Sequence, residues 1–316
     1  MTMLKLALLT WLSMLWSSQR MPGRDWQTEF HARLFKRFFK LADRRGPRWS
    51  RRVIDAQKSN SPVMGRVAFE PFSLGGVHGL TVTPTNRELS TEQVLVYLHG
   101  GGYVTGSAQG YLPFLARIAD QSGVQIYAPN YRLSPEHVYP AAQKDCYRVV
   151  AEIAKLHRQQ QLLLMGDSTG GALCVATALH AELDKPVDAL ILISPWVEPT
   201  ATVGSIFNNV PHDMFEPTFL ASSYQAHLAG ADPFNQQTNF VRADLSHLPR
   251  TLVQYAGGEL FRDQIREFHE RAKRAGVNIK SQEFEHQFHV FQTIAHGFED
   301  SKTARRQIID FLSDLS

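Results

Sequence analysis

Cysteine is scarce in this sequence, and its scarcity excludes a disulfide-stabilised scaffold. The 316 residues hold two cysteines, Cys146 and Cys174. Both fall inside apolar stretches that predict helices, where a free cysteine usually acts as a small buried hydrophobic side chain. Neither has partners at the spacing that a zinc site requires. With 43% hydrophobic and 20% charged residues, the composition is that of an ordinary globular protein large enough to bury a substantial core.

Long apolar runs are also lacking. The most apolar stretch, Leu4–Trp16, is shorter than the roughly 20 residues that a membrane-spanning helix needs. Two interpretations stay open. The stretch is either a retained helix that packs on the protein or lies on a membrane, or the centre of a secretory signal. The following residues, Ser17–Arg20, contain no small-residue cleavage site of the usual kind.

A large overall charge is absent, but the charges are unevenly distributed. The formal net charge is +3, yet residues 1–60 hold 13 lysines and arginines against 4 aspartates and glutamates, and the remainder is net acidic. Because no recognition motif accompanies the basic residues, we expect no nucleic-acid partner. A basic leader favours anionic surfaces, so residues 1–45 are a candidate for peripheral membrane contact. We expect a cytoplasmic protein, with export or membrane association through the apolar N-terminus as the alternative.

The segment that follows the leader has the period of an amphipathic helix. Its apolar positions are spaced by four, four and three residues, and basic side chains lie opposite: Phe30, Leu34, Phe38 and Leu41 against Arg33, Lys36, Arg37 and Lys40. This pattern predicts a helix that covers an apolar surface of its own chain, and a lid over an acyl pocket has the same pattern.

From Val67 the period changes to that of strands. Short β-type runs on either side of Gly75 predict a hairpin or two antiparallel edge strands, and after Pro84 apolar strands alternate with helices. Unbroken apolar strands, such as residues 190–193, indicate a sheet that is covered on both faces. The fold class is therefore predicted to be α/β, with a mostly parallel central sheet flanked by helices.

One interval interrupts the alternation of strands and helices. Between Thr200 and Pro249 the sequence has no strong strand pattern and one helix-like patch, Met214–Leu228. Insertions of this kind usually lie above the carboxyl edge of the sheet, where loops form the site. We therefore expect a catalytic core of residues 61–203 and 241–316, and a helical cap of residues 1–60 and 204–240.

The sharpest local pattern is G-x-S-x-G at residues 166–170. An apolar strand precedes it and an apolar helix follows it, which is the context of a nucleophile elbow. Glycines beside Ser168 permit a tight turn that holds its hydroxyl exposed in a strained conformation. The same turn places the N–H of Thr169 at the start of a helix, where an oxyanion is favoured.

Three consecutive glycines, Gly100–Gly102, follow the strand Val94–Leu98 directly. Glycines let the backbone approach a substrate and direct its N–H groups, so Gly101 and Gly102 are predicted to complete the oxyanion hole with Thr169. The sequence patterns of phosphate and dinucleotide loops are absent, and we expect no cofactor. His99 precedes the loop and is expected to hold it in shape rather than act as the base.

These motifs, in this order, resemble the hormone-sensitive lipase-like branch of the α/β-hydrolases, which includes many bacterial carboxylesterases. The resemblance covers about residues 60–316 and is carried by HGGGYVTGS (99–107), NYRLSPEHVYPAAQKD (130–145), GDSTGG (166–171) and ISPW (193–196). It implies an α/β-hydrolase fold with a helical cap and a triad in the chain order Ser, acid, His. Asn130 replaces the family's usual acid before Tyr-Arg-Leu, at a structural position where we expect no loss of activity.

The resemblance matches the triad acid to Glu259, although the family more often has aspartate there. Asp263 is the alternative, and its other expected role is that of an N-cap or first-turn acid of the following helix. The family's His-x-Phe pattern falls on His289, which we predict to be the base. His286 is expected to be a loop residue, and His296 a surface or helix-start residue. No third ligand accompanies the His-x-x-His spacing, so no metal site is predicted.

The predicted function is that of a serine carboxylesterase acting on small-molecule esters with short to medium acyl chains. Ser168 attacks the ester, His289 takes its proton, and Glu259 orients the imidazole; water then hydrolyses the acyl-enzyme. An amidase or deacetylase would use the same residues, and a membrane-acting lipase would exploit the basic leader. A non-catalytic receptor on this fold would lack the base. The oligomeric state stays open, with a homodimer as one expectation.

Overall fold

Eight strands form one sheet in the order β1-β2-β4-β3-β5-β6-β7-β8. The computed structural model describes residues 3–15, 20–56, 61–180, 183–202 and 204–315. The first two strands form the predicted antiparallel hairpin, and β2 also pairs with β4 in antiparallel fashion. All further pairs are parallel, so the mostly parallel sheet is confirmed. The strands are β1 (Val67–Leu74), β2 (Val77–Pro84), β3 (Gln93–Leu98), β4 (Gln125–Pro129), β5 (Gln161–Asp167), β6 (Ala189–Ile193), β7 (Arg250–Ala256) and β8 (Ile279–Phe284).

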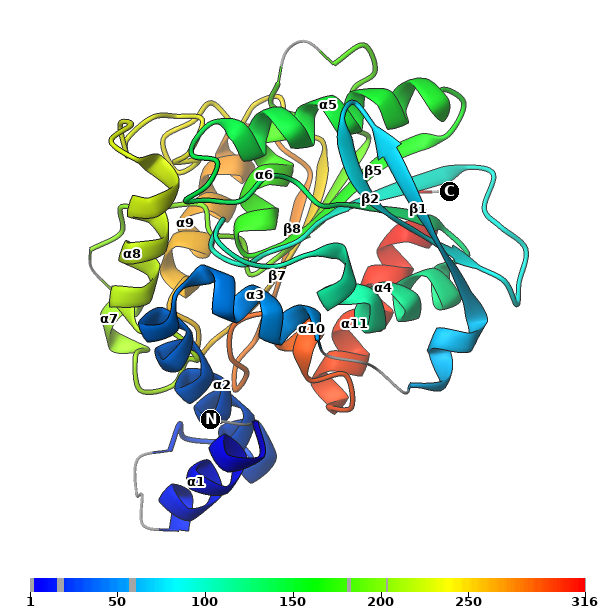
Figure 1. Ribbon diagram of the computed structural model, residues 1–316. Helices are drawn as coiled ribbons and strands as arrows, with labels where there is room; N and C mark the ends of the chain where they lie inside the picture. The colour runs from blue at the N-terminus through cyan, green and yellow to red at the C-terminus, as the bar shows by residue number, and fades with distance from the viewer. Residues whose placement is uncertain (1–2, 16–19, 57–60, 181–182, 203, 316) are drawn as a thin grey trace.

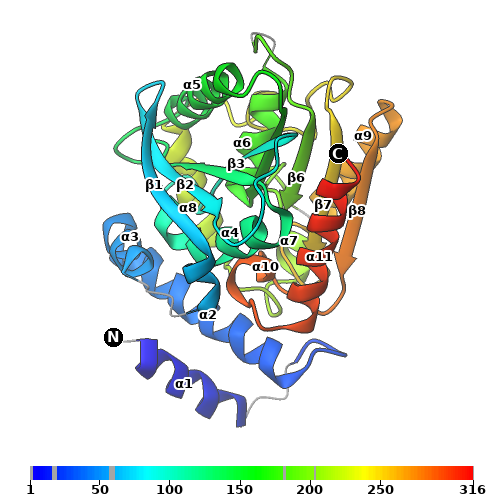
Figure 2. The same ribbon diagram turned by 90° about the vertical axis from the view of Figure 1, so that its right-hand side faces the viewer.

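Helices cover both faces of the sheet, which explains why its central strands are apolar without alternation. Every residue of β3 and β6 is buried. Helices α4 and α11 pack together on one face, and α5 and α6 on the other (Figures 1 and 2). Ser107 caps the start of α4, and Gly123 ends it in the left-handed conformation that favours glycine. The flanking helices are α4 (Ala108–Ser122), α5 (Ala141–Leu156), α6 (Thr169–Ala178), α9 (Arg262–Arg274) and α11 (Glu299–Ser313).

Three helices precede the sheet: α1 (Met3–Leu15), α2 (Trp26–Arg45) and α3 (Pro47–Asp55). The apolar leader forms α1, which lies along α2 at the outside of the molecule (Figure 2). The amphipathic pattern lies within α2, which begins one turn earlier than its apolar period because Asp25 accepts a hydrogen bond from the N–H of Thr28 and caps the helix. Helix α3 was not predicted. Gly46, at φ 80°, ends α2, and Pro47 starts α3 without a loop between them.

The interval between β6 and β7 contains α7 (Ser205–Asn208) and α8 (Pro217–Leu228), and α8 packs against α2 (Figure 1). Phe39 of α2 has its ring 4.5 Å from that of Phe215 and 5.4 Å from that of Phe219. Two short segments, η1 (Pro62–Arg66) and α10 (Phe291–Ile294), complete the described elements. No helix in the described ranges combines the length and the apolar character needed to cross a membrane.

Candidate active site

The turn between β5 and α6 places Ser168 in a strained backbone conformation. Its φ is 53° and its ψ −121°, a combination that a residue other than glycine rarely adopts. A Cβ atom at Gly170 would collide with the carbonyl oxygen of Leu98, and one at Gly166 with the backbone of Gly170. The two glycines are therefore required by close backbone approach, as the sequence predicted for an elbow.

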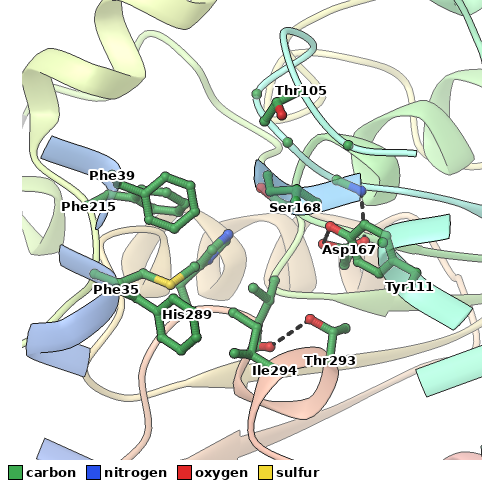
Figure 3. Close-up of a pocket in the computed structure, with 18 of the residues that line it drawn as sticks. Phe35, Phe39, Thr105, Tyr111, Asp167, Ser168, Phe215, His289, Thr293 and Ile294 are labelled. Carbon is green, nitrogen blue, oxygen red and sulfur yellow. Dashed lines mark hydrogen bonds between the residues drawn. The ribbon is translucent and has the colours of Figure 1, made fainter. Parts of the chain in front are cut away.

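Glu259 follows β7, and His289 lies in the loop that follows β8. Their side chains are buried, and Nδ1 of His289 lies 3.5 Å from Oε2 of Glu259. The Ser194 hydroxyl donates a 2.6 Å hydrogen bond to the same carboxylate oxygen and accepts one from the N–H of Val290. In Figure 3 the His289 side chain points toward Ser168. The structure thus brings Ser168, His289 and Glu259 together from three separate loops.

Burial acts on both members of the acid–base pair. It lowers the pKa of His289, against the negative charges of Asp213 and Asp167, and it raises the pKa of Glu259, against the hydrogen bond from Ser194. A neutral imidazole is the form that accepts a proton from a nucleophile. Within the described residues no group is hydrogen-bonded to Nε2 of His289. That nitrogen is therefore available to a hydroxyl.

The glycine loop after β3 is fixed by the carboxylate that precedes the serine. Asp167 accepts hydrogen bonds from the N–H of Gly100 at 2.8 Å and from the hydroxyls of Tyr97 and Tyr111 at 2.5 and 3.0 Å (Figure 3). The next two glycines have φ values of 123° and 65°, which favour glycine. In the described part of the chain, the N–H groups of Gly101, Gly102 and Thr169 donate to no other protein group. They are thus available to an oxyanion.

Several residues that the sequence assigned to structural roles occupy such positions. His99 is buried, stacks on Tyr131 and contacts the Gly100 carbonyl through Nδ1 at 2.8 Å. Asn130 accepts a 2.7 Å hydrogen bond from the N–H of Ala108 at the start of α4. Asp263 lies in the first turn of α9 and accepts a 2.8 Å bond from the N–H of Ser205.

The two histidines that flank His289 have different surroundings. His286 lies in the loop and is part-exposed, as expected. His296 does not lie on the surface or at a helix start. It occupies the turn between α10 and α11, is partly buried, and lines the cavity next to Ser168. The expectation failed because the short helix α10, which the sequence did not reveal, turns the chain back toward the cavity.

Sequence reasoning missed Asp213, a buried carboxylate in the insertion. One of its oxygens accepts hydrogen bonds from the N–H groups of Met214 at 2.8 Å and His289 at 3.1 Å, and the other from Leu260 at 2.8 Å. It therefore ties the acid loop to the base loop. The sequence carried no signal for it, because a single aspartate in an irregular stretch has no distinguishing pattern.

Arg24 is a second residue that the sequence did not single out. Its guanidinium donates to the carbonyls of His286 at 2.7 Å, Gln287 at 2.8 Å and His212 at 2.6 Å, and lies 3.4 Å from Glu29. Burial lowers the pKa of Arg24, and the charges of Glu29 and Asp213 oppose that change. Through these contacts the segment before α2 holds the loop that carries His289.

Ser168, His289 and the glycine loop line a cavity of about 370 Å³. Phenylalanines of α2 and of the insertion form one side of it, and Tyr111, Thr293 and Ile294 the other, with Ser168 between them (Figure 3). No cluster of three or more histidine, cysteine or acidic side chains with the geometry of a metal site occurs in the described ranges. The arrangement places a serine hydroxyl and an imidazole at the cavity, a carboxylate behind the imidazole, and backbone N–H groups beside the hydroxyl.

Comparisons with known proteins agree on one family. A family model for the alpha/beta hydrolase fold matches residues 95–293. An esterase of Acinetobacter venetianus is 26% identical over 93% of this chain and 98% of its own length, and an acetyl-hydrolase of Streptomyces hygroscopicus is 32% identical over 63% and 68%. The crystal structure of an esterase from the bacterial hormone-sensitive lipase family superposes with a TM-score of 0.79 at 28% identity, covering 89% of this chain and 97% of that one.

Proposed function

Because the chain belongs to the α/β-hydrolase family, in its hormone-sensitive lipase-like branch, and is a carboxylic ester hydrolase, we propose that it cleaves short- to medium-chain acyl esters with Ser168, His289 and Glu259 as its triad. The observation that carries the proposal is that Ser168 and His289 line one cavity of limited volume, while Glu259 lies next to Nδ1 of His289. An amidase or deacetylase would use the same groups. Comparing the hydrolysis rates of matched ester and amide substrates distinguishes these activities from that of an esterase.

In the proposed mechanism Ser168 Oγ attacks the ester carbonyl carbon as Nε2 of His289 takes the hydroxyl proton. Glu259 holds Nδ1 of the ring and stabilises the imidazolium that forms. The negative charge on the carbonyl oxygen is received by the N–H groups of Gly101, Gly102 and Thr169. The protonated imidazole then gives its proton to the departing alkoxide, and the alcohol leaves an acyl-enzyme. Water attacks the acyl-enzyme with His289 again as the base, and Ser168 is restored with release of the acid.

The preference for short to medium chains rests on the walls of the cavity. Phe35, Phe39 and Phe215 close its apolar side, and its volume lies near the lower end of small-molecule sites. We propose that residues 1–60 and 204–240 act as the cap, because the aromatic wall comes from these two segments.

A panel of p-nitrophenyl esters from acetate to palmitate, with matched anilides, tests this function. We expect kcat/KM to be highest between acetate and octanoate, and the anilides to react far more slowly. A maximum at palmitate would contradict the chain-length proposal, whereas faster anilide than ester turnover would favour the amidase.

We propose a second property, contact with an anionic membrane through α1. Its outer face exposes Leu8, Leu9, Trp11, Leu12 and Leu15, of which Leu8 is 57% and Leu15 56% exposed, while Leu6 and Met14 pack inward. Exposed basic residues lie on the neighbouring helix at spacings of three and four, namely Arg37, Lys40 and Arg44. An apolar face beside basic side chains matches an anionic bilayer surface, because burial of the apolar side chains and attraction between opposite charges both contribute to binding.

Vesicle co-sedimentation of the full chain tests this contact. We expect binding to phosphatidylcholine vesicles that contain phosphatidylglycerol, weaker binding without it, and loss of binding in the double variant Leu8→Ser, Leu12→Ser. Leu156→Ser on α5 is the matched control, because Leu156 is also exposed, at 62%, but lies away from α1. Equal binding by the double variant and the control would contradict the proposal. Light scattering on the same samples tests the predicted homodimer.

A further inference from the structure

Helix α8 packs on the glycine loop at two successive residues of that loop. Ser223 lies beside Gly102, because a Cβ atom at Gly102 would come within 3.2 Å of the Cβ and Oγ atoms of Ser223. One turn further along α8, the ring of His227 stacks on that of Tyr103, with the ring centroids 3.8 Å apart and the planes at 9°. Residues four apart on a helix share one face. One face of α8 therefore supports the two residues that follow Gly101.

Tyr103 has a backbone conformation that a bulky residue disfavours. Its φ is 63°, in the left-handed region that favours glycine. Such strain persists only where the surrounding structure imposes it. The Tyr103 carbonyl accepts a 2.9 Å hydrogen bond from the N–H of Ser134, and its ring is buried against His227. The contact with α8 is thus one of the constraints that keep the loop in this conformation.

His227 is itself held in place and carries no charge. It is fully buried, and burial lowers its pKa to about 4, so the ring is neutral at neutral pH. It therefore contacts Tyr103 as one aromatic ring contacts another, not as a cation. The His227 carbonyl accepts a 2.8 Å hydrogen bond from the N–H of Tyr139, and its Nδ1 lies 3.4 Å from the hydroxyl of Ser134. Ser134 thus contacts both members of the stacked pair.

We propose that His227 is a positioning residue for the oxyanion hole, and that its stacking on Tyr103 keeps the N–H of Gly102 at the place where the oxyanion forms. The proposal rests on the proposed esterase function, with Gly102 as one of its donors. Gly102 and Tyr103 are joined by one rigid peptide unit, so a shift of Tyr103 moves Gly102 with it. His227 does not line the cavity, and it acts only through the loop.

A displaced donor affects the transition state more than the substrate. The negative charge on the carbonyl oxygen develops only as Ser168 attacks, so the N–H of Gly102 contributes most at that moment. Loss of the stacked ring should therefore lower kcat with little change in KM. A general loss of packing would not produce this division.

The test combines two substitutions at His227 with two inhibitors. His227→Asn removes the ring but keeps a polar side chain, whereas His227→Phe keeps a ring and loses both nitrogens. The Ser168 hydroxyl adds to the carbonyl carbon of pentyl trifluoromethyl ketone, His289 takes the proton, and the resulting oxyanion enters the hole. Pentyl methyl ketone binds without this adduct. The ratio of the two inhibition constants therefore measures the oxyanion hole separately from binding of the neutral ligand.

The two substitutions should differ. For His227→Asn we expect kcat for p-nitrophenyl butyrate to fall about tenfold or more, KM to change less than about twofold, and the advantage of the trifluoromethyl ketone to shrink about tenfold or more. His227→Phe should retain most of the activity and most of that advantage. His180→Asn is the matched control. His180 also stacks on a tyrosine, Tyr147, at 3.9 Å, but it follows the end of α6 that is far from Ser168.

Each outcome decides the question. An unchanged inhibitor ratio in His227→Asn overturns the proposal, as does a change in KM alone or an equal loss in His227→Asn and His227→Phe. If His227→Asn does not fold, Tyr103→Leu removes the same stacked contact, with Tyr103→Phe as its conservative partner, and the same ratio is measured. A wild type that does not hydrolyse p-nitrophenyl butyrate would instead contradict the proposed function, so the two failures are distinguishable.

Discussion

The loops at the carboxyl ends of the strands and the N-terminal helices both line the cavity, but they are built differently. Each reactive group of the loops is held by buried hydrogen bonds from a neighbouring loop, as Ser194 and Asp213 hold Glu259 and His289 in place. Helix α2 instead contributes phenylalanines that pack on one another and on Phe215. Directional bonds fix atoms for chemistry, whereas apolar rings define a volume. We therefore expect changes in the loops to affect the rate of the reaction and changes in α2 to affect the choice of substrate. Arg24 is an exception, because it precedes α2 but bonds to the loop that carries His289.

The largest effect is expected at the centre of the loop region. Ser168→Ala should lower turnover of p-nitrophenyl butyrate by roughly a thousandfold or more, because binding and the oxyanion hole alone then remain. Circular dichroism and thermal unfolding check that the variant keeps its fold. Substantial activity in a folded variant would remove Ser168 from the mechanism.

A second prediction concerns Glu259 and tests whether this side chain orients His289. Glu259→Gln should lower kcat by on the order of a thousandfold, since the buried carboxylate next to Nδ1 of His289 is lost. Asp263→Asn is the matched control and should cost far less, because Asp263 bonds to Ser205 in the insertion. If Asp263→Asn had the larger effect, the acid would lie four residues further along the chain.

Arg24 does not fit the division between the loops and the N-terminal segment. It belongs to the N-terminal segment but bonds to the loop that carries His289. Arg24→Gln should lower kcat about tenfold or more, with a smaller change in KM, and destabilise the fold by about 2 kcal/mol, since the carbonyls of His286, Gln287 and His212 lose a charged donor while Glu29 keeps its ion pair with Arg33. Arg20→Gln, an exposed arginine on the same segment, should do neither. A change in KM alone would show that the segment acts only on substrate entry.

A smaller effect is expected from the aromatic wall. Phe39→Ala should raise kcat/KM for octanoate relative to butyrate several-fold, because it widens the cavity on its apolar side. Phe30→Ala on the same helix is the control, since Phe30 packs toward α1 instead. An identical chain-length profile in both variants would mean that Phe39 does not limit the acyl chain.

The smallest expected effect is a shift along the pH axis. The proposed mechanism requires neutral His289, and burial lowers its pKa, so the acid limb of kcat/KM should lie below pH 6.5, with activity lost as pH falls through that limb. Asp213→Asn removes a negative charge that raises this pKa. The limb should therefore move to lower pH, by up to about one unit. Movement to higher pH would contradict the assignment of the limb to His289.

The parts of the fold that the sequence could predict are those with a repeating pattern. Period and apolar runs identified the sheet, the hairpin and α2, and fixed-spacing glycines identified the turn at Ser168. Helices α3 and α10 escaped prediction because a nine-residue helix after a glycine and a four-residue helix carry too few turns for a period to emerge.

In the candidate site, residues with a motif could be predicted and residues that support them could not. Ser168, Glu259 and His289 were proposed from motifs and resemblance. Asp213 and Arg24 act through contacts to backbone atoms far along the chain, and such contacts leave no mark on neighbouring residues. His296 was expected on the surface or at a helix start, and that prediction was wrong because the packing of α10 beside the cavity depends on tertiary structure.

The contacts of Arg24 have a consequence for how the protein is made. Arg24 bonds to carbonyls 262 and 263 residues further along the chain. During synthesis, helix α2 leaves the ribosome long before those carbonyls are made. Its phenylalanines are therefore exposed until the later part of the chain has folded and can cover them. Contacts of such long sequence separation form late, and exposed apolar surface aggregates in the meantime. Arg24, which holds the loop of His289 in the folded protein, is therefore among the last side chains to find its partners during synthesis.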